Sequence, residues 1–282
     1  MVNIQNIQDW LKTLETSKGK YKLSKNAFHK DSLDATSLAL DLRHMLGIGQ
    51  DSLNESLSYF NKNQEKATGF FHEPFVSELD TSTDRILEMS GTYLGYQLGA
   101  MMLSLNIEPK YHFKFYEQFI KNKNIKEYMS NSMPWDKAPM GAGNMIDHGA
   151  TMMRMNIKMG YSDYEEVISD MYDWLEINQD KKTGLWGSVK PQGNNGLVQA
   201  GYHLMRGTYF YDKKEIKYLE EIIDTTIKSI KECPIFKDGV GEGCHDMDHF
   251  VILEQGLKQT NGYRENDIKS IVSQRLEQLE VM

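Results

Sequence analysis

The sequence predicts an all-α protein in which helical hairpins form an α/α barrel, a ring of about five to six hairpins around a central hollow. Three observations predict this fold. Apolar residues recur with the helical period along most of the 282 residues, and no alternating strand pattern of useful length occurs. In addition, one phrase occurs twice, at residues 59–71 and 174–186. A repeat of this kind indicates one supersecondary unit used more than once.

Helical periodicity places most of the elements. Pro74, Pro134, Pro139, Pro191 and Pro234 all lie between the expected helices, where helix breakers belong. Ser32 precedes one expected helix as a potential N-cap. The expected helices are 4–16, 32–47, 52–64, 82–104, 112–121, 142–159, 162–178, 195–210, 214–231, 245–259 and 264–280.

The expected helices alternate in character, which is why they are assigned to two layers. One set is rich in small residues, Met and Tyr and is predicted to be buried on all sides: 32–47, 82–104, 142–159, 195–210 and 245–259. The other set is charged along one face and is predicted to be half-exposed: 52–64, 112–121, 162–178, 214–231 and 264–280. Inner helices alternating with outer helices are typical of a barrel of hairpins.

We expect a single domain over residues 1–282, because no linker of distinct composition occurs. The stretch 105–141 departs most from the repeat and is expected to be an irregular connection between hairpins, containing Pro134-Trp135-Asp136. Long connections in compact domains often carry function.

Composition excludes several classes of protein. The net charge of −8 argues against nucleic acid as a partner, and no apolar run is long enough for a membrane span. Cys233 and Cys244 are too few for a disulfide framework and are expected to be reduced. No signal peptide is visible, so we expect a cytoplasmic protein.

The two repeated turns resemble a motif of a known superfamily. Gln64-x4-Gly69-x-Phe71 and Gln179-x4-Gly184-x-Trp186 are similar to the QW motif of terpenoid cyclases, which recurs in the β subunits of protein prenyltransferases. The resemblance implies an α/α toroid in which each turn follows an outer helix and ties one hairpin to the next. The Gln amide would satisfy backbone groups at a helix end, the Gly would permit the turn, and the aromatic ring would fill the gap between hairpins.

The resemblance implies a fold more than an activity. A third turn at 238–241 keeps only the glycine. Asp246-Met247-Asp248-His249 is similar to the Asp-x-Asp-Asp segment of class II terpene cyclases, but His249 replaces the last Asp. Cys244-His245-Asp246 contains the residue types of the prenyltransferase zinc site in a different order. The toroid also hosts enzymes that act on carbohydrates, so the fold does not select the reaction.

The inner helices of such a ring point the same way, so their N-termini meet at one mouth. We expect the catalytic residues there, with Asp248 as the acid and His245 as its partner. Asp246 should diverge from Asp248 by about 200° on a helix. The full set of expected catalytic residues is Asp248, His245, Asp246, Asp147 and His148.

Substrate contacts are expected around this mouth, with Trp135 as a stacking platform for a sugar. The expected substrate-binding residues are Trp135, Glu73, Asp84, Asn194, Trp186 and His249. Simpler interpretations stand beside these. Asp34 and Asp84 fit helix caps, His203 fits a core histidine, and the 245–249 cluster fits an exposed turn with a structural ion pair.

These residues lead to three hypotheses of function. The first is an enzyme acting on a carbohydrate or activated sugar by Asp/His acid–base catalysis, of hydrolase or lyase type. The second is a terpenoid cyclase or prenyltransferase-like enzyme using the Asp-x-Asp segment. The third is a non-catalytic helical scaffold. We expect no cofactor; the alternative is a divalent metal at His245, Asp246 and Asp248. Only five inner helices are expected, so a homo-oligomer could supply the sixth position of a closed ring.

Overall fold

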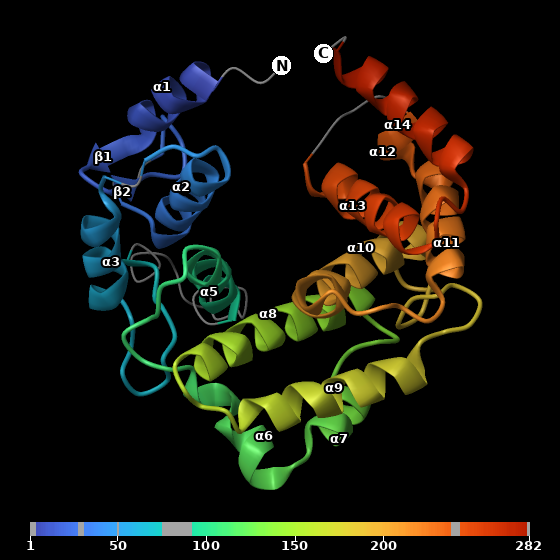
Figure 1. Cartoon of the computed structure of the whole chain (residues 1–282), viewed down its shortest axis with the longest axis horizontal. Coiled ribbons are helices and arrows are strands. Elements are labelled where there is room, and N and C mark those ends of the chain that lie inside the picture. The colour runs from blue at the N-terminus through green and yellow to red at the C-terminus, as the bar shows by residue number, and fades with distance from the viewer. Residues whose placement is uncertain (1–3, 28–30, 50, 75–91, 238–242, 281–282) are drawn as a thin grey trace. The chain divides into compact units, whose positions relative to one another are not determined.

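A computed structural model describes residues 4–27, 31–49, 51–74, 92–237 and 243–280 (Figure 1). This part of the chain is mostly helical, as the sequence predicts. None of the helices described is long and apolar enough to cross a membrane. The chain divides into two compact units, one made of residues 1–123 and 151–166 and the other of 124–150 and 167–282.

The first unit contains the N-terminal helices and a small hairpin. Helix α2 packs against α5, and Leu11, Leu14 and Tyr21 form a core with Ala35 and Ala39. Its elements are α1 (Ile4–Leu14), β1 (Glu15–Ser17), β2 (Lys20–Tyr21), α2 (Leu33–Met45), α3 (Leu53–Lys62), α5 (Leu94–Ser104), the 3₁₀ turn η3 (Lys114–Tyr116) and α6 (Glu117–Asn122). The β1–β2 hairpin was not predicted, because strands of three and two residues are too short to show an alternating pattern.

The second unit contains the remaining helices. Helices α10 and α13 pack against each other, and both contact α11. Its own elements are α7 (Ile125–Asn131), α10 (Gly193–Met205), the π-helical turn η4 (Arg206–Phe210), α11 (Leu219–Glu232), α12 (Pro234–Lys237), α13 (Cys244–Gln259) and α14 (Glu265–Glu280). Two longer helices, α8 (Pro139–Lys158) and α9 (Tyr164–Asn178), each contribute residues to both units.

Several sequence expectations need adjustment. The stretch 105–141 contains the short helices α6 and α7. Pro139 and Pro234 are the first residues of helices. Proline is tolerated there because the first residue of a helix does not need its N–H for an intrahelical hydrogen bond. Asp34 is not the cap of α2: the Ser32 hydroxyl accepts from the Ala35 N–H at 3.1 Å. The Gly turn at 238–241, the beginning of the 82–104 helix and Asp84 lie outside the described residues.

The two copies of the repeat form the same turn. In the first unit the Gln64 amide donates to the Gly69 carbonyl at 2.7 Å, and in the second the Gln179 amide donates to the Gly184 carbonyl at 2.7 Å. Phe71 and Trp186 are both buried behind their turns. The predicted role of Gly is confirmed by the positive φ of Gly69 and Gly184, whereas the Gln amide bonds the turn's own carbonyl instead of a helix end.

The Gln64 amide also ties its turn to the next segment of the chain. Its oxygen accepts from the Tyr111 N–H at 2.9 Å, and its nitrogen donates to the Tyr111 carbonyl at 2.7 Å. Gln64 is buried, so these bonds satisfy polar groups that water cannot reach. In the first copy, the Gln side chain therefore links its turn to the segment that precedes η3.

Candidate functional site

Three helices of the second unit run parallel near their N-termini, which brings their polar residues together. The Met140 N–H at the start of α8 donates to the side chain of Gln192, which precedes α10, at 3.4 Å. At the start of α13, His245 Nδ1 lies 3.4 Å from the side chain of Asn195 in the first turn of α10. The N-termini of α8, α10 and α13 therefore lie near one another. The expectation that Asp147 begins a helix at this end is wrong: Asp147 is the ninth residue of α8, and it contacts His203 and Arg206 at the C-terminal end of α10.

Close packing between α8 and α10 places a buried carboxylate. A Cβ added at Gly207 would lie 2.6 Å from the Cα of Asp147, so only glycine permits this approach. Asp147 is fully buried and forms an ion pair with Arg206, whose Nε donates to Oδ2 at 2.9 Å. Arg206 belongs to the π-helical turn η4, a distortion that is frequent at functional sites.

His203 joins the same cluster. The Arg206 guanidinium donates to His203 Nδ1 at 3.0 Å, and the Asp147 carboxylate lies 3.7 Å from that nitrogen. A guanidinium can only donate, so Nδ1 is the acceptor and Nε2 carries the ring proton of neutral His203. The sequence favoured a core histidine at this position. The structure places its side chain, 14% exposed, between acidic and basic partners.

Asp248 is the second buried carboxyl group of the cluster. Its exposed fraction is zero, and neither of its oxygens has a hydrogen-bond partner among the described residues. Burial raises its pKa, while His203 and Arg206 oppose that rise, as do the nearby Gln199 amide and His245. An unpartnered buried carboxylate is costly, so burial shifts Asp248 toward its protonated form relative to an exposed Asp.

The two carboxyl groups therefore stand in different environments. Asp147 has an arginine partner, whereas Asp248 has none and is biased toward its protonated form. Separation of this kind is how enzymes divide acid and base roles between two carboxyl groups. The sequence predicted both residues, but it did not predict that Arg206 and His203 lie between them.

A stripe of polar residues runs along α10 and into η4, and the sequence analysis did not predict it as part of the site. Asn195, Gln199, His203 and Arg206 follow one another at spacings of four, four and three residues, which places them on one helix face. The rest of α10 is largely buried and apolar. A polar stripe on a buried helix was a usable signal in the sequence, because polar groups in a core need partners.

Two other members of the 245–249 cluster are engaged elsewhere. Asp246 accepts from Arg275 Nε at 2.7 Å and from its Nη2 at 3.0 Å, which ties α13 to α14. His249 is fully buried: its Nδ1 donates to the His245 carbonyl at 2.8 Å, and Ser229 donates to its Nε2 at 2.9 Å. Asp246 and Asp248 are two residues apart on a helix, so their side chains diverge, Asp246 toward Arg275 and Asp248 toward His203 and Arg206.

The remaining expected contact residues are dispersed. Glu73, in the first unit, caps α2 by accepting from Leu33 and Asp34 N–H groups at 2.9 and 3.2 Å. In the second unit, Trp186 is buried and donates to the Leu175 carbonyl at 2.7 Å, while Asn194 donates to Glu232 at 2.7 Å. None of these contacts joins the Asp147–Asp248 cluster.

His148 lies beside Asp147 in the second unit. Burial lowers its pKa to about 4, which the Asp147 charge opposes and the His203 and Arg206 charges reinforce. The side chain is therefore neutral near pH 7. Among the described residues, no three His, Cys, Asp or Glu side chains are grouped closely enough to hold a metal ion.

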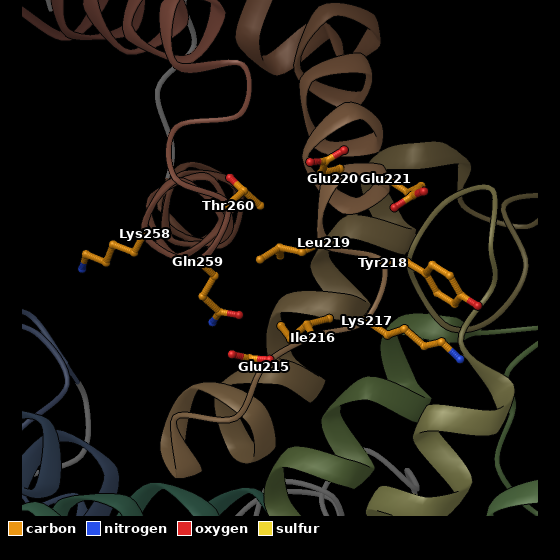
Figure 2. Close-up of a pocket in the computed structure, with 10 residues that line it drawn as sticks. All are labelled: Glu215, Ile216, Lys217, Tyr218, Leu219, Glu220, Glu221, Lys258, Gln259 and Thr260. Atoms are coloured by element: carbon orange, nitrogen blue, oxygen red, sulfur yellow. The ribbon is translucent and has the colours of Figure 1, made fainter.

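A separate groove of about 630 Å³ lies at the other end of α13 (Figure 2). It is lined by the segment that leads into α11, including Glu215 and Leu219, and by the last residues of α13, including Gln259. Asp248 is some ten residues from this end of α13, or about 15 Å along the helix. This groove is therefore distinct from the Asp147–Asp248 cluster.

One buried histidine, His249, and one partly buried histidine, His148, predict an acid sensitivity of the fold. Burial lowers the pKa of both His148 and His249 to about 4 from the ordinary 6.5. Their folded-state pKa values are depressed, so their stabilising contribution is complete above pH 6.5 and falls as the pH drops toward 4. For fully buried His249 the loss amounts to at most about 3 kcal/mol.

Urea unfolding at several pH values between 7 and 4 measures this effect. His249→Asn keeps a donor near the His245 carbonyl and cannot titrate, so its stability should fall less steeply with pH than that of the parent chain. Asp248 acts in the opposite sense, because its raised pKa favours the folded state at low pH. Parallel pH profiles for the parent and His249→Asn would contradict the assignment.

Comparisons of the chain with protein-family models, with curated proteins and with solved structures found no match.

Proposed function

We propose that the second unit carries an acid–base catalytic site for a carbohydrate or activated sugar, of hydrolase or lyase type. The observation that carries the proposal is Asp248, a fully buried carboxyl group with no hydrogen-bond partner among the described residues and a raised pKa. A protonated acid of this kind is suited to donate a proton to a leaving-group oxygen.

The second group of the reaction comes from the same cluster. Asp147, paired with Arg206, supplies a carboxylate, while His245 is partly exposed at the N-terminal end and is suited to accept a proton. In a hydrolysis, Asp248 protonates the oxygen of the breaking glycosidic bond and a base takes a proton from the attacking water. Asn195 and His245 together offer hydrogen-bonding groups to substrate hydroxyls.

The wider architecture belongs to the same proposal. We propose that the hairpins are those of an α/α toroid, supported by the two identical turns and by the packing of α2 on α5 and of α10 on α13. A cytoplasmic location is also proposed, and the free thiols of Cys233 and Cys244 agree with it. A homo-oligomer is compatible with this arrangement.

The terpenoid-cyclase alternative has less support. It requires the two acids of the Asp-x-Asp segment to act together. However, Asp246 accepts from Nε and Nη2 of Arg275, whereas Asp248 lies near His203 and Arg206. His203, Arg206 and His245 also give Asp248 a charged and polar surrounding. A carbocation needs an aromatic, weakly polar one.

Asp248→Asn tests the proposal with two readouts of opposite sign. Turnover of a panel of polysaccharides, followed by reducing ends and by the absorbance of unsaturated products, should fall by at least about 100-fold, as expected for loss of a general acid. The free energy of unfolding at pH 7 should rise by about 1 kcal/mol, because folding no longer has to bury a group whose pKa is raised in the folded state.

Asp246→Asn on the same helix is the matched control. It should lower stability, since the Arg275 ion pair is lost, and leave turnover unchanged. If Asp248→Asn keeps full turnover, the acid assignment is wrong. If the parent chain turns over no member of the panel, the carbohydrate assignment is wrong.

A further inference from the structure

The second unit contains a groove that the acid–base cluster does not use. It has a volume of about 660 Å³, within the range typical of small-molecule sites. Trp135, Asp136 and Trp174 line it together with the last residues of α9 and the second copy of the repeated turn. None of its lining residues belongs to α10 or α13, so it is separate from Asp248 and Arg206.

Two tryptophans form one wall of this groove. Their rings stack with centroids 5.1 Å apart at an interplanar angle of 21°. The Trp135 indole donates to the Met129 carbonyl at 2.6 Å, and the Trp174 indole donates to Ser130 Oγ at 2.7 Å. Both ring nitrogens are therefore satisfied within the protein, and the rings are fixed before any ligand arrives. A rigid aromatic wall loses little conformational entropy on binding.

The apolar surface continues beyond the rings. Ile177, in the last turn of α9, lines the groove and is 81% exposed, and Trp135 is the more exposed of the two stacked rings. A large apolar side chain this exposed beside an aromatic wall indicates a surface that contacts something.

The charges around the groove cancel. Asp136 and Asp180 are matched by Lys181 and Lys182, and the Asp180 carboxylate also accepts from the Lys182 and Thr183 N–H groups at 2.9 and 2.8 Å. A charge-balanced rim offers no net attraction to a phosphate or to a polyanion. It does offer both donors and acceptors to hydroxyl groups.

We propose that this groove is an auxiliary carbohydrate-binding site for a neutral oligosaccharide. A sugar ring has an apolar face of C–H groups that can lie against an indole, and hydroxyl groups at its rim that can bond the surrounding carboxylates and ammonium groups. The groove holds a carbohydrate chain at the surface of the protein and takes no part in bond cleavage. The proposal stands independently of the acid–base site, because no residue is shared.

Affinity electrophoresis of the full chain tests it, with neutral polysaccharides (xylan, glucomannan, laminarin) in the gel and polygalacturonate as the anionic comparison. At least one neutral polysaccharide should retard the parent chain, and Trp135→Ala should weaken its binding by at least about tenfold, or about 1.4 kcal/mol. Trp135→Phe keeps an aromatic ring over Trp174 and should retain part of the retardation.

Controls separate the groove from the fold and from the acid–base site. Trp10→Ala removes another tryptophan, 54% exposed on α1 of the first unit, and should change nothing. Asp248→Asn should bind as the parent chain does, so failure of either proposal is recognised separately. No retardation by any neutral polysaccharide, retardation only by polygalacturonate, or equal retardation of Trp135→Ala would each overturn the proposal. So would a dimer of the parent chain in light scattering that Trp135→Ala converts to a monomer.

Discussion

Gly184→Ala is expected to lower the free energy of unfolding by about 3 kcal/mol or more, one of the two largest effects we predict. Gly184 has a φ of +70°, where a side chain is strained. A Cβ there would also lie 2.6 Å from the Ile222 backbone nitrogen, against the first turn of α11. The backbone cannot yield as a flexible side chain could, so the turn or α11 must move. Urea unfolding followed by tryptophan fluorescence measures the loss.

Gly193→Ala separates strain from collision. Gly193 lies in the same unit with a φ of +66°, and a Cβ there would meet nothing within 4 Å. This control should cost only the conformational strain, about 1–2 kcal/mol. Equal losses for the two variants would show that the close approach of α11 to the turn is not a constraint.

The first copy of the turn offers an independent repetition. Gly69 has a φ of +80°, and its added Cβ would lie 2.9 Å from the Phe113 Cα. Its control is Gly47, with a φ of +66° and nothing within 4 Å. The two turns contain equivalent hydrogen bonds. The difference in free energy of unfolding between variant and control should therefore be similar in both units.

Arg206→Met is expected to destabilise the second unit by about 3–5 kcal/mol. The Asp147 side chain is 1% exposed, and Arg206 is its ion-pair partner. Removing the guanidinium leaves a buried carboxylate that has no other arginine or lysine within ion-pair distance among the described residues. Thermal unfolding at pH 7 measures the loss, which should shrink as the pH falls and the orphaned carboxyl group takes up a proton.

Two comparisons keep this result interpretable. Asp147→Asn leaves Arg206 with 28% of its side chain exposed, where water can solvate it, so the loss should be smaller. Arg275→Met breaks the other buried pair of the unit, but its partner Asp246 is 18% exposed, so the cost should again be smaller. If Arg206→Met is no worse than Arg275→Met, burial of Asp147 does not control the energy of the pair.

Local features of the fold could be predicted from the sequence. Helix periodicity gave α9, α13 and α14 nearly to the residue, because an amphipathic or buried helix imposes its period on the chain. The repeated Gln, Thr, Gly and aromatic residues predicted one turn used twice. Short elements were missed, because β1, β2 and α7 contain too few residues to establish a period.

The candidate site shows the limit of such reasoning. Asp147 and Asp248 were predicted from residue type and from their expected place near helix starts. Their difference was not, because Asp147 depends on Arg206, 59 residues away in sequence. The sequence favoured Asp248 over Asp246 as the acid, but it did not show what either carboxyl group contacts. Only the position of Arg275 on α14 separates a structural ion pair from an unpartnered acid.

The sequence by itself determined what neighbouring residues decide: most of the helices and the two glycine turns. Hydrogen bonds and side-chain periods within a few residues are sufficient for those. The sequence did not fix burial, because α13, which was expected to be buried on all sides, has only five buried residues among its 16. The tertiary structure alone decided which charges meet, because the packing of α8, α10 and α13 sets the partner and burial of each carboxyl group. Partner and burial together set the direction in which the pKa of each carboxyl group moves, and Asp248 combines a raised pKa with two oxygens that lack a hydrogen-bond partner among the described residues.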